Sequence, residues 1–415
     1  MRARWLLAFA LVVTSPGVGA AFSVLAHQAV VDESWDQVLV PRLRARFPQA
    51  REQDLGEARA YAYGGSHLAD LGYFPLGNKL FSELLHYVRT GDFVNTLAAE
   101  SSTPQEYAFA LGALAHYEAD RIGHPEVTNR AVAVIYPKLA RKHGERVTYA
   151  DSPSAHLETE FRFDIFQVAR RAEIPGLFEH AIDFQVPRPL LERAFRKVYG
   201  LELDDLFTSY EVALGTYRWG FRTLIEEATG IAWELYRSDI SALEPTATAQ
   251  TFLFRLSRAD FEREFGKAYS QPGYFFRFMS LLGNLLPNVG PLKRLPYKPL
   301  PPEAQTLYLE GFHRVVIAYQ RALANGALRT LRFANVDLDT GGATRAGEYE
   351  LADEAHAKLL QRLARGHFAN LSPDLGADLL AYFRDVDAGA AGKPADDVLS
   401  ALAELQSVMS EKRHG

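Results

Sequence analysis

The chain has 415 residues, of which 48% are hydrophobic, and it carries a formal net charge of −6. A chain this long and apolar can bury a sizeable core, and its acidic balance argues against the basic surface that is typical of nucleic-acid-binding proteins. Because it contains no cysteine, disulfides and thiolate zinc sites are excluded. Any metal must therefore be held by His, Asp, Glu, main-chain groups or water.

The first residues have the pattern of a targeting segment. Arg2 and Arg4 precede an apolar run over residues 5–13, which is too short to span a membrane, and small residues follow at 19–21. The pattern predicts a signal peptide over residues 1–21, cleaved near Ala20 or Ala21, and hence an exported protein, periplasmic or secreted. An uncleaved membrane anchor is the alternative.

Helical periodicity dominates the rest of the chain, and strand-type alternation is scarce. Helices are expected over residues 22–36, 39–47, 52–71 with an interruption at Gly64-Gly65, 80–89, 104–124, 153–171, 190–198, 206–224, 231–240, 252–265, 304–324 and 351–364. The composition changes at Glu244-Pro245. We therefore expect an all-α protein with one helical domain over 22–244 and a helical extension of unknown role over 245–415.

The most informative stretch is FALGALAHYEADRIGHP, residues 109–125. His116, Asp120 and His124 stand four residues apart, so on a helix they point to one side. Residues 123 and 125, glycine and proline, predict that the helix ends at His124. An apolar stripe that turns into metal-ligand residue types indicates a buried metal site, and the alternative is a structural helix with two incidental histidines.

A second pair at helical spacing follows. His156 and Glu160 lie four residues apart on a helix that begins at residues 151–153, and Asp164 continues the row as a candidate outer partner of the ligands. Seven of the twelve histidines precede residue 160, and the later ones lack carboxylates at ligand spacing. His356 has acidic neighbours, but on a face that we expect to be charged and solvated. The chemistry is therefore expected in the first half.

The candidate ligands occur in the order His27, Asp70, His86, His116, Asp120, His124, His156 and Glu160. This order resembles that of the zinc-dependent phospholipase C family and its relatives, the S1/P1-type nucleases. In those proteins an N-terminal His is followed by an Asp and a His, a helix with H-x3-D and a third His, and then H-x3-E or H-x3-D. The resemblance covers roughly residues 22–165. It implies an all-α, multi-helix phospholipase C/P1 nuclease-like body with a C-terminal helical extension.

The resemblance also implies up to three zinc ions. The first would be held by Asp70, His86, His116 and Asp120, and the second by His124, His156 and Glu160. The third would be held by His27 and a bridging Asp120, together with the amino group and carbonyl of the mature N-terminal residue. In the nucleases the first His lies five residues after that N-terminal residue. Phe22 has this spacing to His27, which predicts cleavage after Ala21.

The chemistry that the resemblance implies is phosphodiester hydrolysis by a zinc-bridging hydroxide, with Asp70 as the catalytic carboxylate that orients or deprotonates the attacking water. We expect a secreted phospholipase C-type enzyme that acts on a phospholipid, with peripheral membrane contact possible through the apolar residues 275–286, which could equally be core. The first alternative is an S1/P1-type single-strand nuclease, made less favourable by the acidic balance. The second is a non-catalytic protein with structural zinc.

Overall fold

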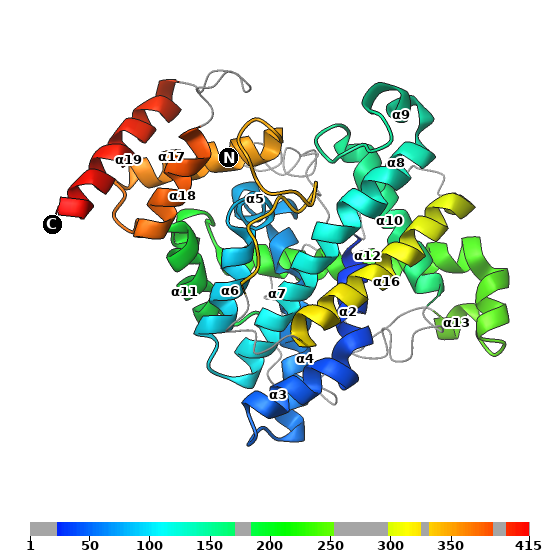
Figure 1. Ribbon diagram of the computed structural model, residues 1–415. Helices are drawn as coiled ribbons and strands as arrows, with labels where there is room; N and C mark the ends of the chain where they lie inside the picture. The colour runs from blue at the N-terminus through cyan, green and yellow to red at the C-terminus, as the bar shows by residue number, and fades with distance from the viewer. Residues whose placement is uncertain (1–22, 171–183, 253–297, 325–331, 385–395, 415) are drawn as a thin grey trace, which may run out of the picture.

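The computed structural model describes residues 23–170, 184–252, 298–324, 332–384 and 396–414 (Figure 1). In these ranges every regular element is a helix, and strand pairing is limited to one isolated bridge between Val336 and Ala343. The all-α prediction is confirmed. Of the helices in these ranges, none has the length and apolarity needed to cross a membrane. The expected leader and the apolar residues 275–286 lie outside the described residues.

The helices follow one another through short connections. The first half contains α2 (Val24–Ser34), the π-helix η1 (Trp35–Leu39), α3 (Val40–Arg46), α4 (Glu52–His67), the 3-10 helix η2 (Leu68–Tyr73), α5 (Lys79–Tyr87), α6 (Thr90–Glu100), α7 (Pro104–Gly123), the π-helix η3 (His124–Thr128), α8 (Asn129–Ile135), α9 (Pro137–His143) and α10 (Pro153–Ala169). The remainder contains α11 (Arg188–Tyr199), the 3-10 helix η5 (Leu203–Asp205), α12 (Tyr210–Leu243), α13 (Ala249–Phe252), α16 (Pro302–Ala324), α17 (Glu350–Arg365), α18 (Pro373–Arg384) and α19 (Asp396–His414).

Helix α7 lies at the centre, and α4 packs along it more extensively than any other described pair of helices. Glycine makes this closeness possible, because a Cβ on Gly65 would lie 2.0 Å from the Phe109 carbonyl oxygen and one on Gly112 would lie 1.9 Å from that of Ala62. The expected helix interruption at Gly64-Gly65 is wrong: α4 runs through to His67. These glycines allow two backbones to touch instead of breaking the helix.

The central helix does not stop where the sequence suggested. Helix α7 ends at Gly123, but the chain continues as the π-helix η3 and then as α8. In an α-helix the ring of Pro125 would clash with the carbonyl four residues earlier, and the wider π turn relieves that clash. His124 is the first residue of this widened turn.

Helices of the C-terminal part pack onto the first half. Helix α16 lies against α7 and α2, and α17 lies against α5 (Figure 1). Tyr319 of α16 donates a hydrogen bond to the Leu111 carbonyl of α7 at 3.0 Å. Lys358 of α17 forms an ion pair with Glu83 of α5 at 3.1 Å. Residues of all these helices belong to one hydrophobic core.

Candidate metal centre

The structure brings all eight predicted ligands into one buried cluster. They come from α2, η2, α5, α7, η3 and α10, and each is at most 4% exposed. They form three groups whose ligand atoms lie within 4.8 Å of one another: Asp70, His86 and His116; His27, His116 and Asp120; and His124, His156 and Glu160.

The first group joins η2, α5 and α7. His86 Nε2 lies 3.5 Å from Asp70 Oδ1 and 3.3 Å from His116 Nε2. Asp70 is fully buried in the 3-10 turn that follows α4, although the sequence suggested only an ordinary loop carboxylate there. The turn directs the carboxylate inward, against the two imidazoles.

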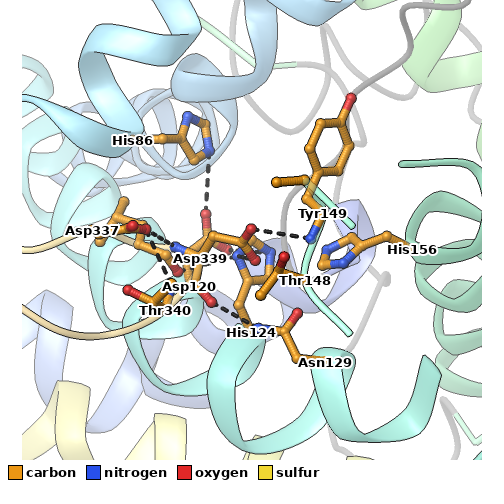
Figure 2. Close-up of polar contacts among 12 residues, drawn as sticks. His86, Asp120, His124, Asn129, Thr148, Tyr149, His156, Asp337, Asp339 and Thr340 are labelled. Carbon is orange, nitrogen blue, oxygen red and sulfur yellow. Dashed lines mark hydrogen bonds and ion pairs between the residues drawn. The ribbon is translucent and has the colours of Figure 1, made fainter. Parts of the chain in front are cut away.

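Asp120 joins the first group to His27. Its Oδ2 lies 2.9 Å from His116 Nε2 and 3.3 Å from His86 Nε2 (Figure 2). Its Oδ1 lies 3.3 Å from His27 Nε2 and 3.8 Å from His124 Nε2. Two oxygens of one carboxylate thus face two different sets of imidazoles, which is the arrangement that a bridging ligand needs. The main-chain ligands implied at residue 22 lie outside the described residues.

The second predicted zinc position is formed at the end of α7. His124 Nε2 and His156 Nε2 approach the same oxygen, Glu160 Oε1, at 3.3 and 2.9 Å. The two imidazole rings meet edge to face, with their centroids 5.1 Å apart. Spacing of four residues places His156 and Glu160 on one face of α10, and the π turn brings His124 to them from the neighbouring element.

The donor atoms fit a metal ion better than they fit one another. Ligand atoms about 2.1 Å from a tetrahedral zinc ion lie about 3.4 Å apart, which is close to the separations above. Moreover, His27 Nε2, His124 Nε2 and His156 Nε2 make no hydrogen bond, and neither do the carboxylate oxygens of Asp70 and Glu160. Polar atoms buried without partners are costly. A cation among them would supply the missing partner.

Burial also sets the protonation states. It lowers the pKa of His27 to about 4 and that of His156 to about 3, so both imidazoles are neutral at physiological pH, as metal ligands must be. Burial likewise raises the pKa of Asp70 and Glu160 well above the ordinary range, a shift that a bound cation reverses. For Asp120, burial acts in the same direction but the neighbouring imidazoles, His116 first, hold its pKa well below the usual value.

Three of the histidines are oriented by main-chain carbonyls behind them. The Nδ1 atoms of His86, His116 and His124 lie 2.8, 3.0 and 3.1 Å from the carbonyl oxygens of Ser82, Ser66 and Leu338. A carbonyl only accepts, so each Nδ1 carries the proton and each Nε2 presents its lone pair to the cluster. The Ser66 contact depends directly on the close packing of α4 against α7.

Two expectations about outer residues need correction. Asp164, expected beside the ligands, accepts hydrogen bonds from Ser23 Oγ at 2.5 Å and from the Leu25 N–H at 2.8 Å, so it fixes the start of α2 and thereby His27. His356, expected on a solvated face, is 3% exposed. It lies on the apolar face of α17 and stacks on Tyr382, with ring centroids 3.5 Å apart.

Sequence reasoning missed one group of residues. Asp337, Leu338 and Asp339 reach the cluster from a loop far along the chain, and Asp339 Oδ1 lies 3.6 Å from His124 Nδ1. The stretch was recognised only as a Gly/Asp/Thr-rich loop. Its two aspartates before a Gly-Gly turn were the available signal, but nothing local connected them to His124.

Comparisons with known proteins agree with this geometry. The model of the family described as zinc dependent phospholipase C matches residues 26–208, a range that contains all eight clustered residues and ends well before the 337–339 loop. No curated protein and no solved structure gave a significant match. Through residues 26–208 the chain belongs to the zinc-dependent phospholipase C family, whose members are phosphoric diester hydrolases.

Proposed function

We propose that the chain is an exported phosphodiesterase that cleaves a phospholipid between glycerol and phosphate, releasing diacylglycerol and a phosphorylated head group. The observation that supports this most is the bridging position of Asp120, whose two oxygens face separate sets of unprotonated imidazoles. A structural zinc site needs four ligands around one ion, whereas this cluster spreads eight ligand residues over three groups.

The assignment of residues follows the groups. Asp70, His86, His116 and Asp120 hold the first zinc, and His124, His156 and Glu160 hold the second. His27 and Asp120 hold the third with the main chain of the mature N-terminus. Zinc bound there supplies Lewis acidity toward the phosphoryl oxygens and lowers the pKa of a water molecule to about 7.

The protein side chains have two tasks in the reaction. Asp70, whose carboxylate oxygens make no hydrogen bond, orients the attacking water and accepts its proton on a carboxylate oxygen. The imidazoles stay neutral because burial keeps their pKa values low, so they hold position as ligands and do not compete for that proton. The site is buried on all sides by helices, which excludes bulk water from the reacting centre.

The test compares three substrates at measured zinc content. Full-length wild-type protein, refolded or purified with zinc, is assayed on phosphatidylcholine vesicles, a soluble choline phosphodiester and single-stranded DNA. We expect cleavage of phosphatidylcholine with diacylglycerol as product. Preferential cleavage of DNA would favour the nuclease instead, and cleavage of none of the three at full zinc occupancy would favour structural zinc.

Asp70→Asn is the variant that examines the proposed base. It keeps the shape of the side chain but cannot accept the proton, so turnover should fall by at least a hundredfold. Asp151→Asn is the matched control, because Asp151 also faces an imidazole, that of His143 at 2.8 Å, but lies outside the cluster and is partly exposed. This control should retain wild-type turnover.

A further inference from the structure

We propose that the loop of residues 337–341 is a positioning element of the metal centre, and that Asp339 is a positioning residue which holds His124 in its ligand form. The inference rests on the assignment of His124 as a zinc ligand in the proposed function. It goes beyond that assignment because the loop lies outside residues 26–208, the range shared with the family. The C-terminal part of the chain would then complete the site and not only cover it.

The first support is the environment of His124 Nδ1. The Leu338 carbonyl oxygen lies 3.1 Å from this nitrogen, and Asp339 Oδ1 lies 3.6 Å from it. Both groups only accept, so both favour the proton on Nδ1 and leave Nε2 free to bind an ion. Leu338 thus provides for His124 what Ser66 and Ser82 provide for His116 and His86.

The second support is that Asp339 is aimed at this position by its neighbours. The Tyr149 N–H at 3.1 Å and the Tyr349 hydroxyl both donate to Asp339 Oδ2, which directs Oδ1 toward His124 (Figure 2). Asp339 Oδ1 is buried and makes no hydrogen bond, and the whole residue is 1% exposed. An imidazole that gains positive character on binding an ion is the group that this oxygen can stabilise.

The third support is the rigidity of the loop itself. Asp337 Oδ1 accepts from the Asp339 N–H at 2.8 Å and from the Thr340 N–H at 3.1 Å, and the Gly341 N–H donates to the Asp337 carbonyl at 2.8 Å. Such side chain-to-backbone bonds fix a turn without help from a helix. The loop therefore presents Leu338 and Asp339 in a fixed geometry.

The loop also connects two groups of the centre. The Leu338 N–H donates to the carbonyl of His86 at 3.0 Å, while the Leu338 carbonyl faces His124. Asn129 of α8, five residues after His124, donates to the Asp339 carbonyl at 2.9 Å. One loop residue thus contacts a histidine of the first group and one of the second, and the next is tied to the helix behind them.

The experiment measures zinc affinity in the full-length chain with Asp339→Asn. Because the Tyr149 N–H needs an acceptor, the amide oxygen takes the Oδ2 position and the amide N–H2 faces His124 Nδ1. This opposes the proton on Nδ1 and so opposes zinc binding at Nε2. We expect one zinc ion to be held at least tenfold more weakly, as measured by elemental analysis over a series of buffered free-zinc concentrations, with the remaining ions unchanged.

Two further variants separate positioning from loop stability. Asp337→Asn is the matched control, because its amide oxygen still accepts from the two N–H groups of the turn while its other atom does not face His124, so zinc affinity should stay at the wild-type value. The double variant His124→Ala/Asp339→Asn should lose no more zinc than His124→Ala alone, because Asp339 acts through His124.

Three results would overturn the inference: wild-type affinity in Asp339→Asn, an equal loss in Asp337→Asn, or additive losses in the double variant. If Asp339→Asn does not fold, as judged by circular dichroism, Tyr349→Phe replaces it, since it removes only the hydroxyl that holds Asp339; a smaller loss at the same ion is then expected, and wild-type affinity would overturn the inference. A wild-type chain that binds no zinc would instead refute the proposed function itself.

Discussion

His86 of the metal centre and His356 of the C-terminal helices make the same local bond, yet their surroundings differ. Each is 3% exposed, and each has Nδ1 at 2.8 Å from the carbonyl four residues earlier in its helix. The ring of His356 lies flat on Tyr382. The Nε2 atom of His86 instead faces Asp70, His116 and Asp120.

A perturbed pKa alone therefore does not mark the site. Burial lowers the pKa of His356 to about 4, as it does for His27 in the cluster. What distinguishes the metal centre is that several buried donors converge without hydrogen bonds. A buried histidine in an apolar helix face is a packing residue, whereas buried histidines that share a carboxylate form a site for a cation.

Removal of zinc should have the largest effect, and only on the metal centre. Exhaustive chelation leaves the ligand atoms of the cluster buried without partners, so hydrolysis should fall to background and the melting temperature should drop by at least 10 °C. Calorimetry and phosphatidylcholine hydrolysis measure the two effects, and added zinc should restore both. Unchanged melting and activity after chelation would remove the distinction between the two regions.

Asp120→Ala should come next, because this residue serves two sets of imidazoles. We expect the zinc content to fall by more than one ion per chain and hydrolysis to be lost, as followed by elemental analysis and by turnover. His143→Ala is the control in the same half of the chain, since His143 pairs only with Asp151. A loss of one ion or fewer in Asp120→Ala would contradict its bridging role.

Gly112→Ala examines how packing supports the centre. The new Cβ would meet the Ala62 carbonyl at 1.9 Å, so α4 and α7 must separate, at a cost of about 3 kcal/mol in the free energy of unfolding. The separation also moves the Ser66 carbonyl away from His116, so zinc affinity should fall. Gly230→Ala in α12 is the control: its Cβ meets nothing within 4 Å, and denaturant unfolding should show a small gain.

His356→Phe should have the smallest effect, and it should depend on pH alone. In the folded wild type the pKa of His356 is about 4, below its ordinary value, so between pH 6.5 and 4 the unfolded chain binds more protons and stability falls as the pH falls. Phenylalanine keeps the stack but does not titrate. In zinc-free protein, the wild type should lose about 2 kcal/mol more than the variant between pH 7 and pH 5. Parallel curves would show that the burial of His356 does not perturb its pKa.

The sequence by itself determined the local part of the site. Spacing of four residues placed His116 with Asp120 and His156 with Glu160, because helical geometry depends only on neighbours in the chain. Helical periodicity also predicted the all-α fold, and the order of the eight candidate ligands indicated the family. These are properties that a short window of sequence, or a simple order along it, carries in full.

Only the tertiary structure decided what surrounds those residues. Gly65 and Gly112 look like helix breakers in sequence but are the contact points of two helices, which brings the Ser66 carbonyl to His116. Leu338 and Asp339 lie more than 200 residues beyond His124 and are placed behind it by packing alone. No local pattern specifies such contacts, because they depend on how helices distant in the chain fill one core.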